Sequence, residues 1–188
     1  PEYTQMMPLA KASITHLYFV CIHPFEDGNG RVGRAIAEKS LAISTGRPAL
    51  MSLSQTIQDA KKHYYDALEK NNKDLDITNW LVYFGKTIIQ AQENTMRQLD
   101  FLINKTKFYD THKMELNERQ LKVVQRLFQA GHTGFIGGLS AENYVRIAKT
   151  SASTATRDLK DLVDKKVLLK IGALKSTRYF LNIKQNKN

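Results

Sequence analysis

The chain has 188 residues, of which 42% are hydrophobic, so it can build one large domain or two small ones, each with a proper core. Its single cysteine, Cys21, excludes an intramolecular disulfide, and because neither a membrane-length apolar run nor a secretory signal is found, we expect a cytoplasmic protein with no membrane partner. The net charge of +10 is placed unevenly: residues 1–112 hold 13 Lys/Arg and 12 Asp/Glu, whereas residues 113–188 hold 15 and 6, which indicates two modules.

The first module is expected to open with a helix. Four residues recur at helical spacing and predict its buried face: Ala12, His16, Phe19 and Ile22. Pro24 disfavours helical angles at the residue before it, so the helix should end near His23. We interpret His16 as a buried, hydrogen-bonding residue that braces the loop after this helix.

The next segment, residues 23–34, combines groups suited to a nucleoside triphosphate. Its glycines let backbone N–H groups converge on an anion, and a helix that begins near Arg31 adds the partial positive charge of its N-terminus. Asp27 is a hard oxygen ligand suited to Mg2+. Arg31 and Arg34 share a helical face, so both can reach phosphates, and His23 can take up a proton near neutral pH.

These twelve residues resemble the Fic family signature His-Pro-Phe-x-Asp-Gly-Asn-Gly-Arg-x-x-Arg at every specified position. The resemblance implies a Fic-type helical bundle that moves AMP from ATP to a Ser, Thr or Tyr hydroxyl of a target protein or of itself. It implies His23 as the base and Asp27 as the Mg2+ ligand. The implied phosphate site comprises Asp27, Gly28, Asn29, Gly30, Arg31 and Arg34, with Asn29 also donating to phosphate. Phe25 should tuck inward to hold the loop, and Gly33 should serve packing. The alternative for residues 23–34 as a whole is a solvated turn between two helices.

Three further helices are expected, over residues 31–45, over 54–71 and from Asp76 to about 107. The last should bury one face, made by Trp80, Phe84, Ile88, Ala91 and Thr95. A tyrosine pair and an asparagine, Tyr64, Tyr65 and Asn72, resemble residues that Fic proteins have at this spacing, at the adenosine end of the nucleotide. The alternative is that one or both tyrosines only pack between helices.

Several Fic elements are not found in this sequence. The motif begins 23 residues into the chain, so the family's earlier helices and the hairpin flap that aligns the target are expected to be missing. The inhibitory pattern Ser/Thr-x-x-x-Glu-Gly/Asn is also absent, which leaves removal of AMP, a reaction that would need this Glu, as a weaker hypothesis. An exposed face of the first helix would need a partner, and a homodimer is one way to cover it.

The second module has a different pattern. Residues 108–116 are polar and predict a linker, after which Asn117 and Gln120 form a capping box that opens a helix to about residue 130. A short strand is expected over 134–139, a helix capped by Ser140 to about 150 and another helix over 153–165. Two strands, 167–171 and 178–183, follow as a hairpin joined by 172–177, and the tail 184–188 is expected to be disordered.

This order of elements resembles a winged helix-turn-helix domain. We therefore expect a mainly α protein, with a Fic-type catalytic domain over 1–108 and a winged-helix domain with a hairpin wing over 117–188. The helix at 153–165 would be the recognition helix, and the DNA contacts implied are Thr154, Thr156, Arg157, Lys160 and Lys175. DNA binding through residues 117–183 would make the protein a regulator with a sensory or regulatory Fic part; protein docking, dimer contacts or a basic surface that only aids solubility are the alternatives.

Overall fold

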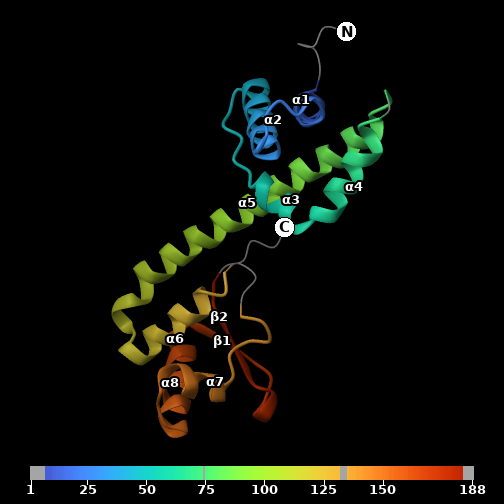
Figure 1. The fold of residues 1–188 in the computed structure, drawn as a ribbon. Helices are drawn as coiled ribbons and strands as arrows, with labels where there is room; N and C mark the ends of the chain where they lie inside the picture. The colour runs from blue at the N-terminus through green and yellow to red at the C-terminus, as the bar shows by residue number, and fades with distance from the viewer. Residues whose placement is uncertain (1–6, 74, 132–134, 184–188) are drawn as a thin grey trace. The chain divides into compact units, whose positions relative to one another are not determined.

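The computed structural model describes residues 7–73, 75–131 and 135–183 (Figure 1). The chain is mainly helical, with one small antiparallel sheet of two strands. It forms two compact units, Pro1–Met96 and Arg97–Asn188, which are described separately below. The division falls within the long helix α5, whereas the domain limits expected from sequence, 1–108 and 117–188, stay predictions.

The first unit is built from helices: α1 (Pro8–Ile22), α2 (Asn29–Thr45), α3 (Leu53–Asp59), α4 (Lys61–Asn71) and the first part of α5 (Thr78–His112). α1 ends where Pro24 predicted, because His23 leaves the helical region for a left-handed conformation with φ 51° and ψ 54°. α2 begins two residues before Arg31 and ends at Gly46, which adopts the left-handed conformation expected of a glycine after a helix.

Two expectations for this unit were wrong. The buried stripe of α1 is rotated from the predicted face: Ala12 and His16 are buried with Ser13 and Leu17, while Ile22 is 71% exposed. The helix expected over 54–71 is two helices, because the backbone turns at Ala60, where φ is −118° and ψ is 34°. Alanine is a good helix former, so no residue at the break announces it.

The core of the first unit lies against α5. Trp80, Phe84, Ile88 and Ala91 are fully buried, as their helical spacing predicted, and Trp80 Nε1 donates a hydrogen bond to the Ser13 carbonyl over 2.8 Å. The other buried hydrophobic residues come from all four preceding helices: Ala12, Leu17, Ala37, Leu41, Leu53, Ile57, Tyr64 and Leu68. α5 is therefore the element on which the helices of this unit assemble.

α1 and α2 pack very closely at Gly33. A Cβ atom added at Gly33 would lie 3.1 Å from Val20 Cγ2 and 3.2 Å from His16 Nδ1. The packing role expected for Gly33 is confirmed, and the glycine allows the start of α2 to lie directly against the end of α1.

The second unit contains the last part of α5 and a compact group of short elements. These are a 3-10 turn (Lys113–Glu115), α6 (Glu118–Phe128), α7 (Ala141–Ala148), α8 (Ala152–Asp164), β1 (Leu168–Ile171), a second 3-10 turn (Leu174–Ser176) and β2 (Arg178–Leu181). The capping box of Asn117 and Gln120 is confirmed, and Ser140 and Ser151 cap α7 and α8 through their side chains. α5 continues to His112, so residues 108–112 are helical and not part of a linker.

The hairpin of the second unit is confirmed, but the strand expected over 134–139 is not. β1 and β2 pair in antiparallel register, with Leu168 opposite Leu181 and Ile171 opposite Arg178. Leu139 joins them by a single bridge to Tyr179, and the described residues before it form a bend and a turn. Position 134 and the tail 184–188 lie outside the described residues.

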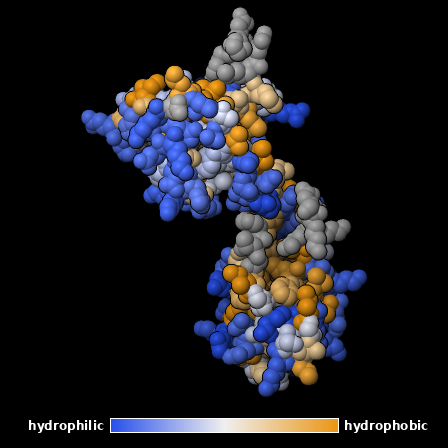
Figure 2. Space-filling view, turned by 90° about the vertical axis from the view of Figure 1, so that its right-hand side faces the viewer, coloured by the Kyte–Doolittle hydropathy of each residue, from blue (hydrophilic) through white to orange (hydrophobic). Residues whose placement is uncertain are grey.

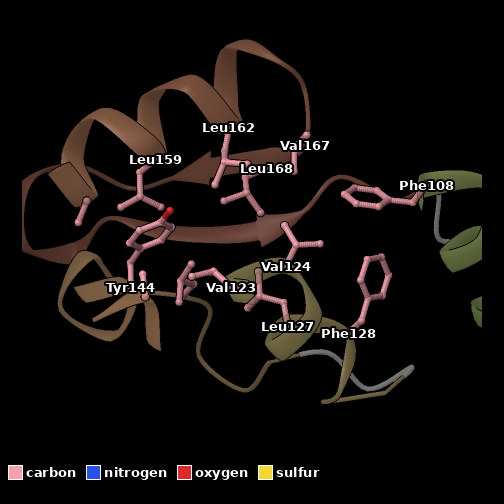
Figure 3. Close-up of a cluster of buried hydrophobic side chains, with 13 residues drawn as sticks. Phe108, Val123, Val124, Leu127, Phe128, Tyr144, Leu159, Leu162, Val167 and Leu168 are labelled. Carbon is pink, nitrogen blue, oxygen red and sulfur yellow. The ribbon is translucent and has the colours of Figure 1, made fainter. Parts of the chain in front are cut away.

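The core of the second unit lies between α6, α8 and the hairpin (Figure 3). Side chains of α6 point toward those of α8 and β1 (Figure 3). The aromatic pair of Phe108 and Phe128 lies at one end of this core (Figure 3). A polar network links α6, α7 and α8: the buried Tyr144 hydroxyl and the exposed Arg119 guanidinium both donate to the buried Asp158. The order of elements on which the winged-helix prediction rests is present, and assignment to that fold stays a prediction.

Hydrophobic side chains also lie on the surface. Figure 2 shows them in orange among hydrophilic residues on the visible face of each unit. In the first unit, a groove of about 600 Å³ is lined mostly by apolar residues of α1, with Ile36 and Ile77 beside them. None of the helices in the described ranges combines the length and the hydrophobicity that crossing a membrane requires.

Candidate functional site

The loop between α1 and α2 is held by Asn29. The side chain of Asn29 is buried; its Oδ1 accepts from the Phe25 N–H over 3.0 Å and its Nδ2 donates to the Phe25 carbonyl. This reciprocal pair fixes the loop at both backbone groups of one residue. The Phe25 ring does not tuck inward as expected: it is 51% exposed and rests against Phe19 at a ring-centroid distance of 6.2 Å. Asn29, rather than Phe25, therefore holds the loop.

His23 stands at the end of α1 with an exposed imidazole ring. Its Nδ1 lies 3.3 Å from the Val20 carbonyl, which can only accept, so this contact requires the proton on Nδ1. The neutral ring then carries its lone pair on Nε2. That is the arrangement a general base needs, because the free nitrogen can take a proton from a bound hydroxyl.

The start of α2 forms the backbone cradle. Gly28 adopts a left-handed conformation with φ 85°, and the first N–H groups of α2, which follow it, have no acceptor within the helix. Gly30 lies inside α2, where a Cβ atom would approach Arg34 to 3.3 Å, so the glycine keeps space for that guanidinium. An anion at this helix end would meet unpaired N–H groups and two arginines.

The charged side chains of the motif are paired with neighbours. Asp27 Oδ2 lies 2.9 Å from an Arg31 guanidinium nitrogen, and Oδ1 accepts from the Gly28 N–H over 2.6 Å. Arg34 Nε donates to Ser54 Oγ over 2.9 Å. The Asp27 side chain is 91% exposed, so solvent and a nucleotide can both reach it.

The motif offers the Asp27 carboxylate as a ligand for Mg2+. Among the described residues no cluster of three His, Cys, Asp or Glu side chains could hold a metal by itself. Mg2+ commonly takes one or two carboxylates and completes its shell with phosphate oxygens and water. A single reachable carboxylate beside a cradle for phosphates fits that chemistry, with Asp27 as the protein ligand.

A cavity of about 380 Å³ adjoins His23. It is lined by Val20, Cys21, His23, Tyr65, Leu68, Glu69 and Asn72. Three residues singled out in the sequence, His23, Tyr65 and Asn72, thus share one cavity although 49 positions separate the first from the last. Sequence reasoning missed Leu68 and Glu69, yet both follow Tyr65 at helical spacing, a signal that could have found them.

Tyr64 does not reach this cavity. It is buried in the core of the first unit, where its hydroxyl lies 2.9 Å from His16 Nε2. Burial lowers the pKa of His16 to about 4, although the nearby Gly33 backbone acts in the opposite direction, and burial raises the pKa of Tyr64 to about 12. Both side chains are therefore neutral at pH 7. The expectation of a buried, hydrogen-bonding His16 is confirmed, and Tyr64 is the packing member of the tyrosine pair.

The residues expected to contact DNA lie on α8 and on the hairpin loop. Thr156, Arg157 and Lys160 are exposed on α8, and Lys175 is exposed in the turn between β1 and β2. Thr154 is half-buried and accepts a hydrogen bond from the capping residue Ser151. α8 buries the opposite face, with Ala155, Leu159 and Leu162, so its polar residues form an outward surface.

Comparison with known proteins gives a partial match. Residues 1–41 match the model of the Fic/DOC family. A 69-residue stretch is 38% identical to the protein adenylyltransferase Fic of Culex quinquefasciatus, which corresponds to 36% of this chain and 13% of that protein. A solved structure of a Fic family protein from Desulfovibrio desulfuricans G20 aligns with 98% of this chain and 51% of its own, at 20% identity and a TM-score of 0.46. The chain thus spans a small part of the curated relative and about half of the solved one.

Proposed function

We propose that this chain carries the catalytic segment of a protein adenylyltransferase, which moves AMP from ATP to a hydroxyl group of a protein. The observation that carries the proposal is the position of His23. Its Nε2 is left free because Nδ1 contacts Val20. His23 also lies between the N-terminus of α2, which is suited to bind phosphate, and a cavity of about 380 Å³. The match of residues 1–41 to the Fic/DOC family supports the same chemistry.

In the proposed reaction, the target hydroxyl oxygen attacks the α-phosphorus of ATP. A new P–O bond to the target forms, the bond from the α-phosphorus to the bridging oxygen of the β-phosphate breaks, and pyrophosphate leaves. His23 Nε2 takes the hydroxyl proton as the attack proceeds, which is the task of a general base. The acceptor is a Ser, Thr or Tyr of another protein or of the chain itself.

The start of α2 would hold the phosphates. The free N–H groups after Gly28 and the guanidinium groups of Arg31 and Arg34 would share the charge of the β- and γ-phosphates, which lowers the energy of the departing pyrophosphate. Mg2+ bound to Asp27 would supply further neutralisation of that charge. Because Asp27 now pairs with Arg31, binding of the nucleotide would exchange this ion pair for two new contacts.

The cavity beside His23 would hold the nucleoside. The half-exposed ring of Tyr65 offers a face for the adenine, and Asn72 offers both a donor and an acceptor. Tyr64 would contribute indirectly, by packing α4 against α1. The nucleoside and the phosphates would thus flank His23.

The experiment is incubation of the chain with Mg2+ and ATP labelled at the α-phosphate. We expect label on protein, and a loss of about 100-fold or more in His23→Ala, the range that general bases supply. His63→Ala is the matched control, because His63 is exposed on α4 and does not line the cavity beside His23. Absence of label transfer, or equal transfer by His23→Ala, contradicts the proposal.

A second candidate function, DNA binding by the second unit, is favoured by charge. Residues 113–188 carry a balance of +9, and Arg157, Lys160 and Lys175 are all exposed. Binding to duplex DNA should then weaken steeply as salt increases, since each phosphate contact contributes about −0.9 to the slope of log affinity against log salt. Lys160→Ala should reduce that slope by about 1, and Lys107→Ala on α5 serves as the control. Salt-independent binding, or no binding, refutes this function.

A further inference from the structure

One carboxylate faces the cavity beside His23. Glu69 follows Tyr65 by four residues and precedes Asn72 by three, so the three positions share one side of the end of α4. It is the one carboxylate among the described residues that line this cavity. Glu69 makes no hydrogen bond or ion pair with any residue that the structure describes, so its acceptor oxygens are open to a ligand.

The position of Glu69 in its helix is unfavourable. α4 ends at Asn71, so Glu69 lies in the last turn, where the partial negative charge of the helix end disfavours a carboxylate. The helix dipole therefore gives no reason for an acid here. What can favour a carboxylate at this position is the cavity that Glu69 lines together with His23.

Charge decides which part of a nucleotide can lie beside Glu69. A triphosphate would be repelled by a carboxylate, and its partners, Arg31 and Arg34, stand on α2 rather than α4. The neutral nucleoside is the part that can approach Glu69. Its hydrogen-bond donors are the ribose hydroxyls and the amino group of the base.

The ribose diol suits the carboxylate best. Two vicinal hydroxyls can donate to the two oxygens of one carboxylate, whereas the two N–H donors of an amino group diverge, so that only one of them can point at the same carboxylate. A carboxylate serves the same purpose in dinucleotide-binding folds, where it accepts from a ribose hydroxyl. The ring of Tyr65 in the same cavity suits the base, which leaves the sugar for Glu69.

We propose that Glu69 is a specificity residue that accepts hydrogen bonds from the ribose hydroxyls, so that the cavity selects ribonucleotides over 2′-deoxyribonucleotides. This inference rests on the proposed function, because it takes the cavity beside His23 as the nucleoside site. It adds a residue and a selection rule that the motif of residues 23–34 does not contain.

The test is titration of the full chain with ATP, 2′-deoxy-ATP and inosine triphosphate, in the presence of Mg2+. The wild type should bind ATP about tenfold more tightly than 2′-deoxy-ATP, as expected for loss of a hydrogen bond to a charged group. Glu69→Ala should bring this preference to about twofold or less by weakening ATP alone, and Glu69→Gln should give an intermediate ratio. Asp66→Ala is the control, since Asp66 lies on α4 outside this cavity.

Each other outcome has a distinct meaning. An unchanged ratio of ATP to 2′-deoxy-ATP in Glu69→Ala overturns the inference while His23-dependent label transfer still supports the proposed function. A change in the ratio of ATP to inosine triphosphate instead assigns Glu69 to the base and also overturns it. A shifted pH profile of transfer with an unchanged sugar ratio would mean that Glu69 acts on His23. Failure of every variant and of the wild type to bind nucleotide overturns both proposals. Circular dichroism checks that the exposed substitutions leave the fold intact.

Discussion

The buried contact between His16 and Tyr64 gives the sharpest test of how the first unit is held together. Tyr64→Phe removes one hydroxyl and keeps the ring, so packing around it is preserved. His16 Nε2, now 2.9 Å from that hydroxyl, would lose its partner in a fully buried position. Leaving one buried polar atom unsatisfied costs about 1–3 kcal/mol of the free energy of unfolding.

Trp80 makes this loss measurable in the first unit alone. It is the single tryptophan of the chain, it is fully buried and its ring lies 6.3 Å from the ring of Tyr64. Urea unfolding followed by Trp80 fluorescence should therefore show a lower midpoint for Tyr64→Phe, with an unchanged dependence on urea. Tyr65→Phe is the matched control: its hydroxyl belongs to a half-exposed ring, and a change within about 0.5 kcal/mol is expected. Equal stability of Tyr64→Phe and wild type would refute the claim that this contact joins α1 to α4.

Three further predictions concern the same unit. The pKa of His16 in the folded state, about 4, lies below its ordinary value of 6.5, so the unfolded state binds more protons between these two pH values. The free energy of unfolding should therefore fall by about 3 kcal/mol as the pH drops from 6.5 to 4. Urea titrations at a series of pH values should show this decrease in the wild type and a flatter dependence in His16→Gln. Gly33→Ala should lower the free energy of unfolding by about 1–3 kcal/mol, because the added Cβ would lie 3.1 Å from Val20 Cγ2 and 3.2 Å from the buried His16 ring, which would have to shift. Gly85→Ala, with nothing within 4 Å, should raise it by about 0.5–1 kcal/mol, and equal midpoints of thermal unfolding for the two variants would contradict the packing argument. In urea titrations, the free energy of unfolding of His23→Gly should exceed that of His23→Ala by about 1 kcal/mol, because residue 23 adopts a left-handed conformation. Both variants should lack transfer activity.

Local rules predicted much of this fold. Pro24 located the end of α1, Gly46 the end of α2, and the pairing of Asn117 with Gln120 the start of α6. Each of these signals acts within a few residues of itself, which is why a single sequence can reveal it.

Features that depend on distant contacts were not predicted. The break at Ala60 has no local signal, and it lets α3 and α4 each bury their own residues against α5. Phe25 was expected to tuck inward and hold the loop, but the loop is fixed by polar contacts to Asn29 instead.

In the candidate site, too, some residues could be predicted from sequence and others could not. The residues of the motif could be named from their spacing, whereas the choice between Tyr64 and Tyr65 needed the orientation of α4. Glu69 belongs to the candidate site because α4 and the end of α1 line one cavity, which the sequence alone does not show. Chemistry within the motif is readable from sequence, and so are Tyr65 and Asn72 from their spacing, whereas the orientation of α4 that separates Tyr65 from Tyr64 is not.

The brace made by Asn29 has a thermodynamic consequence for association. A glycine-containing loop that is free in solution must lose conformational entropy when it closes on a ligand, and this loss weakens binding. Here both backbone groups of Phe25 are already held, so that ordering belongs to folding and not to the encounter with a ligand. The Phe25 amide should accordingly exchange slowly with deuterated solvent before any nucleotide is added.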